Sequence, residues 1–189
     1  MRLITLMLGV FLCLFAVPQQ SAEARNFSLD FGGEFTLTNQ HNEPFSLSDA
    51  RGKVVMIFFG FTSCADTCPT TLIKMAAAMK QLGLLSERVL PVFISVDAKR
   101  DTPEVIRQYA AYFHSSIVAL TGTQDEVEAV AKQYRTPVLV RKPSESGFYV
   151  VDHGSRLFFV NQEGVLANIL MFEGSAEQIV SIVKELLEE

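Results

Sequence analysis

Several features that would place this sequence in other protein classes are absent from it. Its basic residues are scattered and form no block, which argues against a nucleic-acid-binding protein. There is no internal repeat, no low-complexity tract and no sign of a second domain. Tryptophan is missing, but the composition is otherwise ordinary for a globular protein, with 49% hydrophobic and 20% charged residues and a net charge of -5. A chain of 189 residues is long enough for one well-cored domain.

The sequence also has no hydrophobic run long enough to span a bilayer comfortably. The longest run, Leu3 to Val17, falls short of the roughly 20 residues that a spanning helix needs. It follows Arg2 and precedes Ala22-Glu23-Ala24, which has the small-x-small pattern of a cleavage site. Residues 1–24 are therefore predicted to be a cleaved secretory signal peptide, with an uncleaved membrane anchor as the alternative. The remaining domain, residues 25–189, is expected in the periplasm or another exocytoplasmic compartment.

The rest of the chain alternates buried strands and amphipathic helices. Continuous apolar runs predict strands buried on both faces, and proline and capping residues mark where helices start. A hairpin signal precedes the last helix. This order predicts an α/β fold with a mixed sheet covered by helices on both faces, which suits a thioredoxin-like fold. The expected strands are 54–59, 89–96, 117–120, 157–160 and 165–170, and the expected helices start near 69, 102, 124 and 176.

Two of the three cysteines, Cys64 and Cys68, lie where the first predicted strand meets the first predicted helix. Cys68 precedes Pro69, so we expect it at the helix N-terminus, where free backbone N–H groups and the helix dipole favour a thiolate. If Cys64 lies in the first turn, its i,i+4 spacing points both sulfurs to one side. Two thiolates form a soft donor pair suited to Cu(I), although the same pair could also form a disulfide.

A stable copper site needs a third ligand, and the candidates are His41, His114 and His153. His153 is favoured by its position just before the predicted hairpin, because that position faces the cysteine loop in thioredoxin-like proteins. His41 lies in a polar turn and His114 at a helix end, so both are interpreted as structural or surface residues. Zinc is a weaker interpretation, since a closed zinc site usually takes four ligands and only three good ones are visible.

Other residues near the cysteines have ordinary structural explanations. Asp66 could tune the thiols or attract a metal, but a helix cap is the favoured role. Asp97 and Arg100 follow a buried strand and are expected to form a loop ion pair or a partner contact. Four methionines fall on apolar faces and are predicted to be core residues rather than copper ligands: Met56, Met75, Met79 and Met171.

Taken together, these motifs resemble the SCO/SenC group of copper chaperones, and the resemblance covers most of residues 27–189. A C-x-x-x-C-P motif with a distant V-D-H is specific at this spacing, whereas a lone C-x-x-x-C would not be. The matching stretches are Arg51–Val54, Phe59–Thr62 with Cys64, Asp66, Cys68 and Pro69, Ser95–Asp97 with Arg100–Pro103, Leu120–Gly122 and Tyr149–His153.

The resemblance implies a thioredoxin-like fold and copper bound by Cys64, Cys68 and His153. It also implies a role in assembling the binuclear copper centre of cytochrome c oxidase. The expected partner is a copper-accepting client such as cytochrome c oxidase subunit II, at the membrane surface. The sequence departs from the family pattern at several positions that are not ligands. One is Gly154, which replaces the usual serine and is expected to loosen the histidine loop.

Two further interpretations use the same thiols. In a thiol-disulfide oxidoreductase, Cys64 would attack if it is the more exposed sulfur, and Cys68 would resolve the mixed disulfide. Some members of the resembled family look more like reductases of this kind. A thiol peroxidase would carry a threonine three positions before its reactive cysteine. Here Phe61 occupies that position and Thr62 is only two before Cys64, which argues against a peroxidase.

Overall fold

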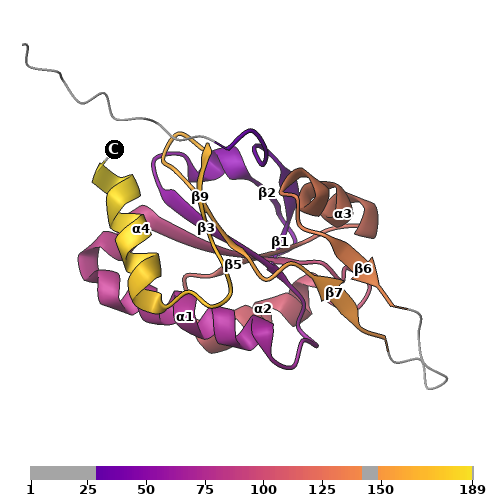
Figure 1. The fold of residues 1–189 in the computed structure, drawn as a ribbon. Helices are drawn as coiled ribbons and strands as arrows, with labels where there is room; N and C mark the ends of the chain where they lie inside the picture. Colours follow the sequence, from indigo (N-terminus) through magenta and orange to yellow (C-terminus); the bar gives the residue numbers. More distant parts are fainter. Residues whose placement is uncertain (1–28, 142–148, 189) are drawn as a thin grey trace, which may run out of the picture.

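A computed structural model describes residues 29–141 and 149–188 of the chain (Figure 1). The predicted signal peptide at residues 1–24 lies outside these ranges. Among the described residues, no helix is both long enough and apolar enough to cross a membrane. The described part confirms the predicted α/β fold with a mixed, helix-covered sheet.

A seven-stranded sheet forms the centre of the fold, in the order β2-β1-β5-β4-β3-β8-β9. Strands β3, β4 and β5 run parallel, while β8, β9, β1 and β2 pair antiparallel with their neighbours. Every residue of β3 is buried, as its continuous apolar sequence requires. The strands are β1 Thr36–Asn39, β2 Pro44–Ser46, β3 Val54–Gly60, β4 Val89–Ser95, β5 Val118–Thr121, β8 Leu157–Val160 and β9 Leu166–Leu170.

Helices cover both faces of this sheet. Helices α1, α2 and α4 lie on one face and α3 lies on the other (Figure 1). The helices are α1 Thr67–Leu82, α2 Pro103–Phe113, α3 Gln124–Gln133 and α4 Ala176–Glu188, with short 3-10 turns η1 at Leu47–Ala50 and η2 at Gly83–Arg88. A separate two-stranded ribbon, β6 Val138–Val140 and β7 Val151–His153, projects beyond the main sheet near α3 (Figure 1).

Aromatic side chains fill the core on both faces. On the α1 and α2 face, the Phe58 ring lies 6.4 Å from that of Phe93, which in turn contacts Tyr109 of α2 at 5.5 Å. On the α3 face, Tyr134 packs against Phe59 at 5.7 Å and near Phe35, while its hydroxyl donates to a backbone carbonyl. The alternation of Phe58 and Phe59 along β3 therefore places one large ring in each half of the core.

The predicted helix starts are mostly confirmed. Helix α3 starts at Gln124 as predicted, where Thr123 and Glu126 form a capping box, and Ser175 and Gln178 exchange the corresponding bonds before α4. Helix α1 begins earlier than predicted, at Thr67, because its first turn is already closed by the bond from the amide of Thr70 to Asp66.

One prediction about side-chain burial was wrong. Met171 is 58% exposed rather than in the core, because it follows the end of β9 in a turn, whereas the other three methionines named above are buried. The sequence analysis also missed β1, β2 and the β6–β7 ribbon. These strands are only three or four residues long, so they carry little local signal.

Candidate metal centre

Three donor atoms from two distant segments meet at one end of the sheet. Cys64 lies in the loop between β3 and α1, Cys68 lies in the first turn of α1, and His153 ends β7. The two sulfurs and an imidazole nitrogen all lie within 4.8 Å of one another. Cys64 precedes the helix, so the i,i+4 premise for the pair does not hold. The loop nevertheless folds back and brings both sulfurs together, with the amide of Cys64 bonded to the carbonyl of Phe61.

Cys68 is the inner sulfur of this cluster and is fully buried. It packs against Gly60, the last residue of β3. A Cβ atom at position 60 would lie 2.9 Å from the Cys68 sulfur and 2.9 Å from the ring of Phe93. Only glycine leaves room for the strand and the thiol to approach this closely. The sequence shows Gly60 within a matching motif, but its packing role becomes visible only in three dimensions.

His153 faces the inner sulfur through its Nε2 atom, which lies 3.3 Å from the Cys68 sulfur. On the other side of the ring, Nδ1–H donates to the carbonyl of Gly154 at 3.0 Å. This bond assigns the proton to Nδ1 and leaves the Nε2 lone pair directed at the sulfurs. Metal-binding histidines commonly have such a carbonyl partner. The edges of the ring contact Phe61 and Phe58.

Cys64 is the outer sulfur and is partly exposed. A hydrogen bond from the Cys68 thiol holds the pKa of Cys64 well below its usual range, and the Thr67 hydroxyl, 3.4 Å away, adds to this effect. The same bond, together with burial, raises the pKa of Cys68. The pair therefore loses its first proton easily, from Cys64, and holds the second on Cys68. This arrangement provides a ready thiolate beside a protonated thiol.

The cysteine loop is anchored by a buried carboxylate that the sequence analysis did not single out. Asp101 accepts hydrogen bonds from the amide of Thr62 at 2.8 Å and from its hydroxyl at 2.6 Å. It also accepts from the hydroxyl of Ser95 at 2.6 Å, and it is fully buried. These bonds fix the loop that carries Cys64 to the end of β4. The matching stretches that contain Ser95 and Asp101 were the available sequence signal.

The other two histidines lie away from the donors, as the sequence analysis expected. His41 is exposed, and the imidazole of His114 pairs with the hydroxyl of Ser116. Asp66 lies beside the donors at the N-cap position of α1, but its side chain makes no capping hydrogen bond, so the predicted side-chain cap was wrong. Asp97 and Arg100 form the expected loop ion pair. Within residues 29–141 and 149–188, the cluster described above is the one group of three or more His, Cys, Asp or Glu side chains close enough to hold a metal.

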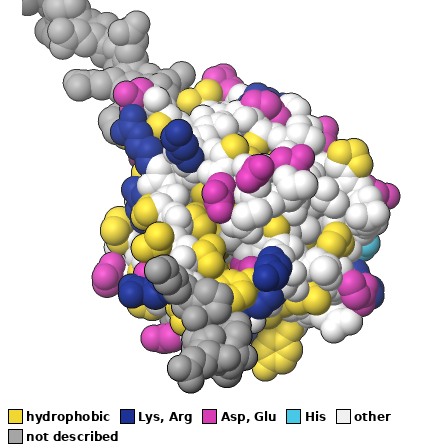
Figure 2. All heavy atoms as spheres, turned by 90° about the vertical axis from the view of Figure 1, so that its right-hand side faces the viewer, with side chains coloured by type: hydrophobic (Ala, Val, Ile, Leu, Met, Phe, Trp, Pro, Cys, Tyr) yellow, Lys and Arg dark blue, Asp and Glu magenta, His cyan; other side chains and the backbone are white. Residues whose placement is uncertain are grey.

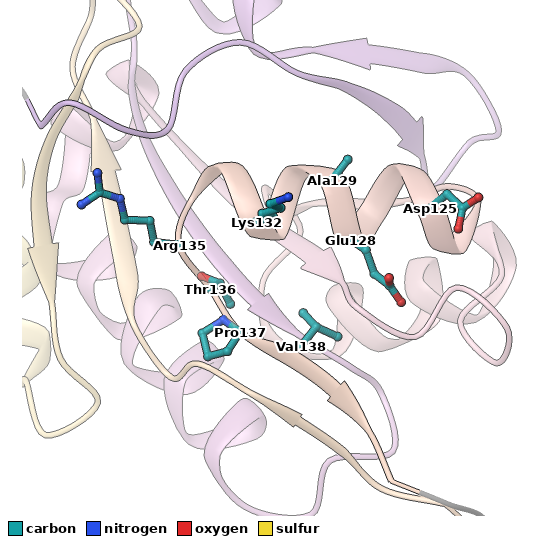
Figure 3. A pocket seen from close by; sticks show the side chains of 8 residues that line it. All are labelled: Asp125, Glu128, Ala129, Lys132, Arg135, Thr136, Pro137 and Val138. Atoms are coloured by element: carbon teal, nitrogen blue, oxygen red, sulfur yellow. The ribbon is translucent and has the colours of Figure 1, made fainter.

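A cavity of about 360 Å³ opens beside Cys64 and is walled by the cysteine loop and the segment leading to His153. A larger hollow of about 670 Å³ lies between α3 and β6, and Figure 3 shows the side chains of Asp125, Glu128 and Lys132 around it. This second hollow has no thiol or imidazole in its lining and is separate from the donor cluster. The smaller cavity is therefore the route by which a ligand could reach the sulfurs.

The ribbon that carries His153 also presents apolar side chains to solvent. Leu139 of β6 is 62% exposed, and Val140 and Val150 are exposed as well. Figure 2 views the molecule from the side to which the ribbon projects and shows hydrophobic side chains mixed with basic and acidic ones on this face. The donor cluster is thus bordered by a surface of mixed apolar and charged character.

The fold and the cluster define a thioredoxin-like protein with two thiols and one imidazole at a single site. Comparison with known proteins gives the family. The SCO1/SenC family model matches residues 23–188. An SCO2-like protein of Rickettsia prowazekii is 34% identical over 157 residues, which cover 82% of this chain and 77% of the relative. The chain belongs to the SCO1/SenC family.

Solved structures agree with this assignment. The ScoI protein of Bradyrhizobium japonicum, solved with copper bound, is 30% identical with a TM-score of 0.77, covering 83% of this chain and 99% of that one. BsSco, described as having a disulfide switch and as a member of the Sco family of cytochrome c oxidase assembly proteins, is 27% identical with a TM-score of 0.65, covering 90% of this chain and 99% of that one. The expected thioredoxin-like family fold is confirmed.

Proposed function

We propose that this chain is a copper chaperone that binds one Cu(I) ion through Cys64, Cys68 and His153 and supports assembly of the copper centre of a cytochrome c oxidase. The observation that carries the proposal is the convergence of two sulfurs and one imidazole nitrogen within 4.8 Å. Soft thiolates with an imidazole suit Cu(I) better than magnesium or calcium, which prefer oxygen donors. A copper-bound relative and a family named for oxidase assembly support the same function.

The geometry suits a carrier that both holds and releases its cargo. Cys68 and His153 form the inner side of the site, while the more exposed Cys64 lies beside the open cavity. Copper binding would displace the proton that Cys68 retains, so binding and proton release are linked. A donor group of the client could enter from the cavity and take the place of Cys64 first. The ion would then pass between proteins without ever being free in solution.

Titration of the reduced protein with Cu(I), in competition with a chromophoric Cu(I) chelator, tests this function. Wild-type protein should bind one ion per chain. The His153→Ala variant should bind about a hundredfold more weakly, which corresponds to ~2.7 kcal/mol. The matched control is His41→Ala, which removes an exposed imidazole outside the donor cluster and should leave the Cu(I) affinity unchanged. Equal affinities for all three proteins would reject His153 as a ligand.

A second function, thiol-disulfide exchange, is favoured by the lowered pKa of Cys64. The Cys64 thiolate would attack a client disulfide, form a mixed disulfide and release one client thiolate. Cys68 would then lose its proton to Nε2 of His153, attack the Cys64 sulfur and release the second client thiolate. The client gains two electrons, and the chain is left with a Cys64–Cys68 disulfide. A Cys68→Ala variant should trap the mixed disulfide, detectable by non-reducing electrophoresis, and a Cys64→Ala variant should not.

We also propose that the protein acts outside the cytosol. The signal-like residues 1–24 are followed by a domain with two cysteines, and disulfide chemistry persists in exocytoplasmic compartments. Mass spectrometry of protein recovered from the periplasm should find a new N-terminus at Arg25. Retention of Met1 on a membrane-bound form would instead identify an uncleaved anchor.

A further inference from the structure

Tyr149 lies just before the strand that carries His153, and it is held at three points by the loop that follows β4. Its hydroxyl donates to Oδ1 of Asp97 at 2.7 Å. Its carbonyl accepts from Nη1 of Arg100 at 3.1 Å. Its ring stacks on the guanidinium of Arg100, with 3.9 Å between the guanidinium carbon and the ring centroid. A loop residue with this many specific contacts has little freedom to move independently of β4.

The loop that holds Tyr149 is itself fixed to the core. Asp97 is 3% exposed, it pairs with Arg100, and its amide donates to the hydroxyl of Ser95 at 3.2 Å. The Ser95 hydroxyl in turn donates to Asp101, the carboxylate that anchors the cysteine loop. One short segment therefore carries two carboxylates, and each one binds a different half of the metal site. Asp101 binds the half with the thiols, and Asp97 binds the half with the imidazole.

A second set of contacts links the same arginine to the imidazole. The guanidinium of Arg100 lies 5.6 Å from the ring centroid of Phe61, on the cysteine loop. The Phe61 ring meets His153 edge-on, with centroids 5.6 Å apart. Arg100 thus touches both the residue that leads into β7 and the aromatic side chain against which the imidazole rests. Its Nη2 atom is buried and has no hydrogen-bond partner among the described residues, so hydrogen bonding alone does not explain its placement.

From these contacts we infer that Asp97, Arg100 and Tyr149 form a clamp that sets the position of His153 relative to the two sulfurs. The members of the clamp are positioning residues and do not touch the metal. Among the described strands, β6 and β7 pair only with each other, so without the clamp the imidazole would be held by its bond to the Gly154 carbonyl, its contact with the Cys68 sulfur and its packing on Phe58 and Phe61. The inference rests on the proposed function, in which His153 is a copper ligand.

A double-mutant cycle tests this clamp. Tyr149→Phe removes only the hydroxyl and keeps the ring on Arg100, so the fold should survive, as urea unfolding would verify. Cu(I) affinity should fall about tenfold, the lower end of the range typical for partners that orient a ligand. In the His153→Ala background the same substitution should change affinity less than about twofold, because the residue it positions is gone. Tyr112→Phe, which alters an 85% exposed tyrosine, is the matched control and should have no effect.

A second measurement needs no copper. In the reduced, metal-free protein, amide hydrogen exchange of residues 151–153 should be about tenfold faster in Tyr149→Phe than in wild type or Tyr112→Phe. An equal loss of affinity in the wild-type and His153→Ala backgrounds, or unchanged exchange at residues 151–153, would overturn the clamp. If His153→Ala alone left affinity unchanged, the ligand assignment would fail, while the exchange rates would still decide whether Tyr149 holds the ribbon.

Discussion

The two halves of the metal site are built very differently. The thiol half belongs to the main fold, since Cys68 is buried in α1 against β3, the fully buried strand of the seven-stranded sheet. The imidazole half belongs to a two-stranded ribbon that has exposed apolar side chains and lies outside that sheet. The thiols are therefore placed by the core itself, whereas the imidazole is placed by a few specific contacts.

The largest difference should appear between the two sulfurs of the thiol half. The pKa of Cys64 is lowered, so its thiolate persists as the pH falls and is lost only when the pH drops through that lowered pKa. At pH 5, iodoacetamide should label Cys64 about tenfold faster than an ordinary thiol, because the larger thiolate fraction outweighs the weaker nucleophilicity of a low-pKa thiolate, whereas buried Cys68 should stay unlabelled. Removing the hydrogen-bond donor in Cys68→Ala should shift the labelling profile of Cys64 several pH units upward. Mass spectrometry of labelled peptides gives both profiles, and identical profiles would contradict the thiol pairing.

The next largest effect, on the free energy of unfolding, should come from replacing one carboxylate in each half of the site. Asp101→Asn replaces a buried charge that accepts three hydrogen bonds and should lower the free energy of unfolding by about 3 kcal/mol. Asp152→Asn weakens an exposed ion pair of the ribbon, in which Asp152 lies 2.6 Å from Arg141. This substitution should change the free energy of unfolding by less than about 1 kcal/mol. Urea unfolding of the reduced proteins measures both. Similar losses in the two variants would show that the halves are equally integrated into the fold.

Substitutions of two glycines, one in each half of the site, should have smaller effects on stability. In Gly60→Ala the new methyl would lie 2.9 Å from the Cys68 sulfur, so the free energy of unfolding should fall by about 2 kcal/mol. In Gly154→Ala the methyl would lie 3.4 Å from the nearest atom, a methyl carbon of Thr136, and stability should change by less than about 0.5 kcal/mol. Thermal unfolding distinguishes the two. A larger loss from Gly154→Ala would mean that the ribbon is packed more tightly than its contacts indicate.

The elements with strong local patterns could be predicted from the sequence. The apolar run at β3 and the capping box at Thr123 and Glu126 are patterns formed by residues close together in the sequence. The structure contains both the strand β3 and the helix α3 that these patterns indicate. The ribbon could not be predicted, because each of its strands, which pair Val138 with His153, is only three residues long. Short strands of this kind depend on tertiary contacts more than on local propensity.

In the candidate site, too, some features could be predicted from the sequence and others could not. The sequence motifs pointed to Cys64, Cys68 and His153, and the structure brings their donor atoms together. Asp101 and Tyr149 both lie in the matching stretches, but the sequence does not show which part of the site each one supports, because they act through contacts across the fold. Their roles follow only from which atoms they touch.

X-ray absorption spectroscopy of the Cu(I)-loaded, reduced protein tests the central assignment most directly, because it reports the atoms bound to the metal. We expect two sulfur ligands and one nitrogen ligand in the wild-type protein, and loss of the nitrogen in His153→Ala with both sulfurs retained. A wild-type spectrum with sulfur ligands alone, or a nitrogen contribution that survives in His153→Ala, would contradict the three-donor site.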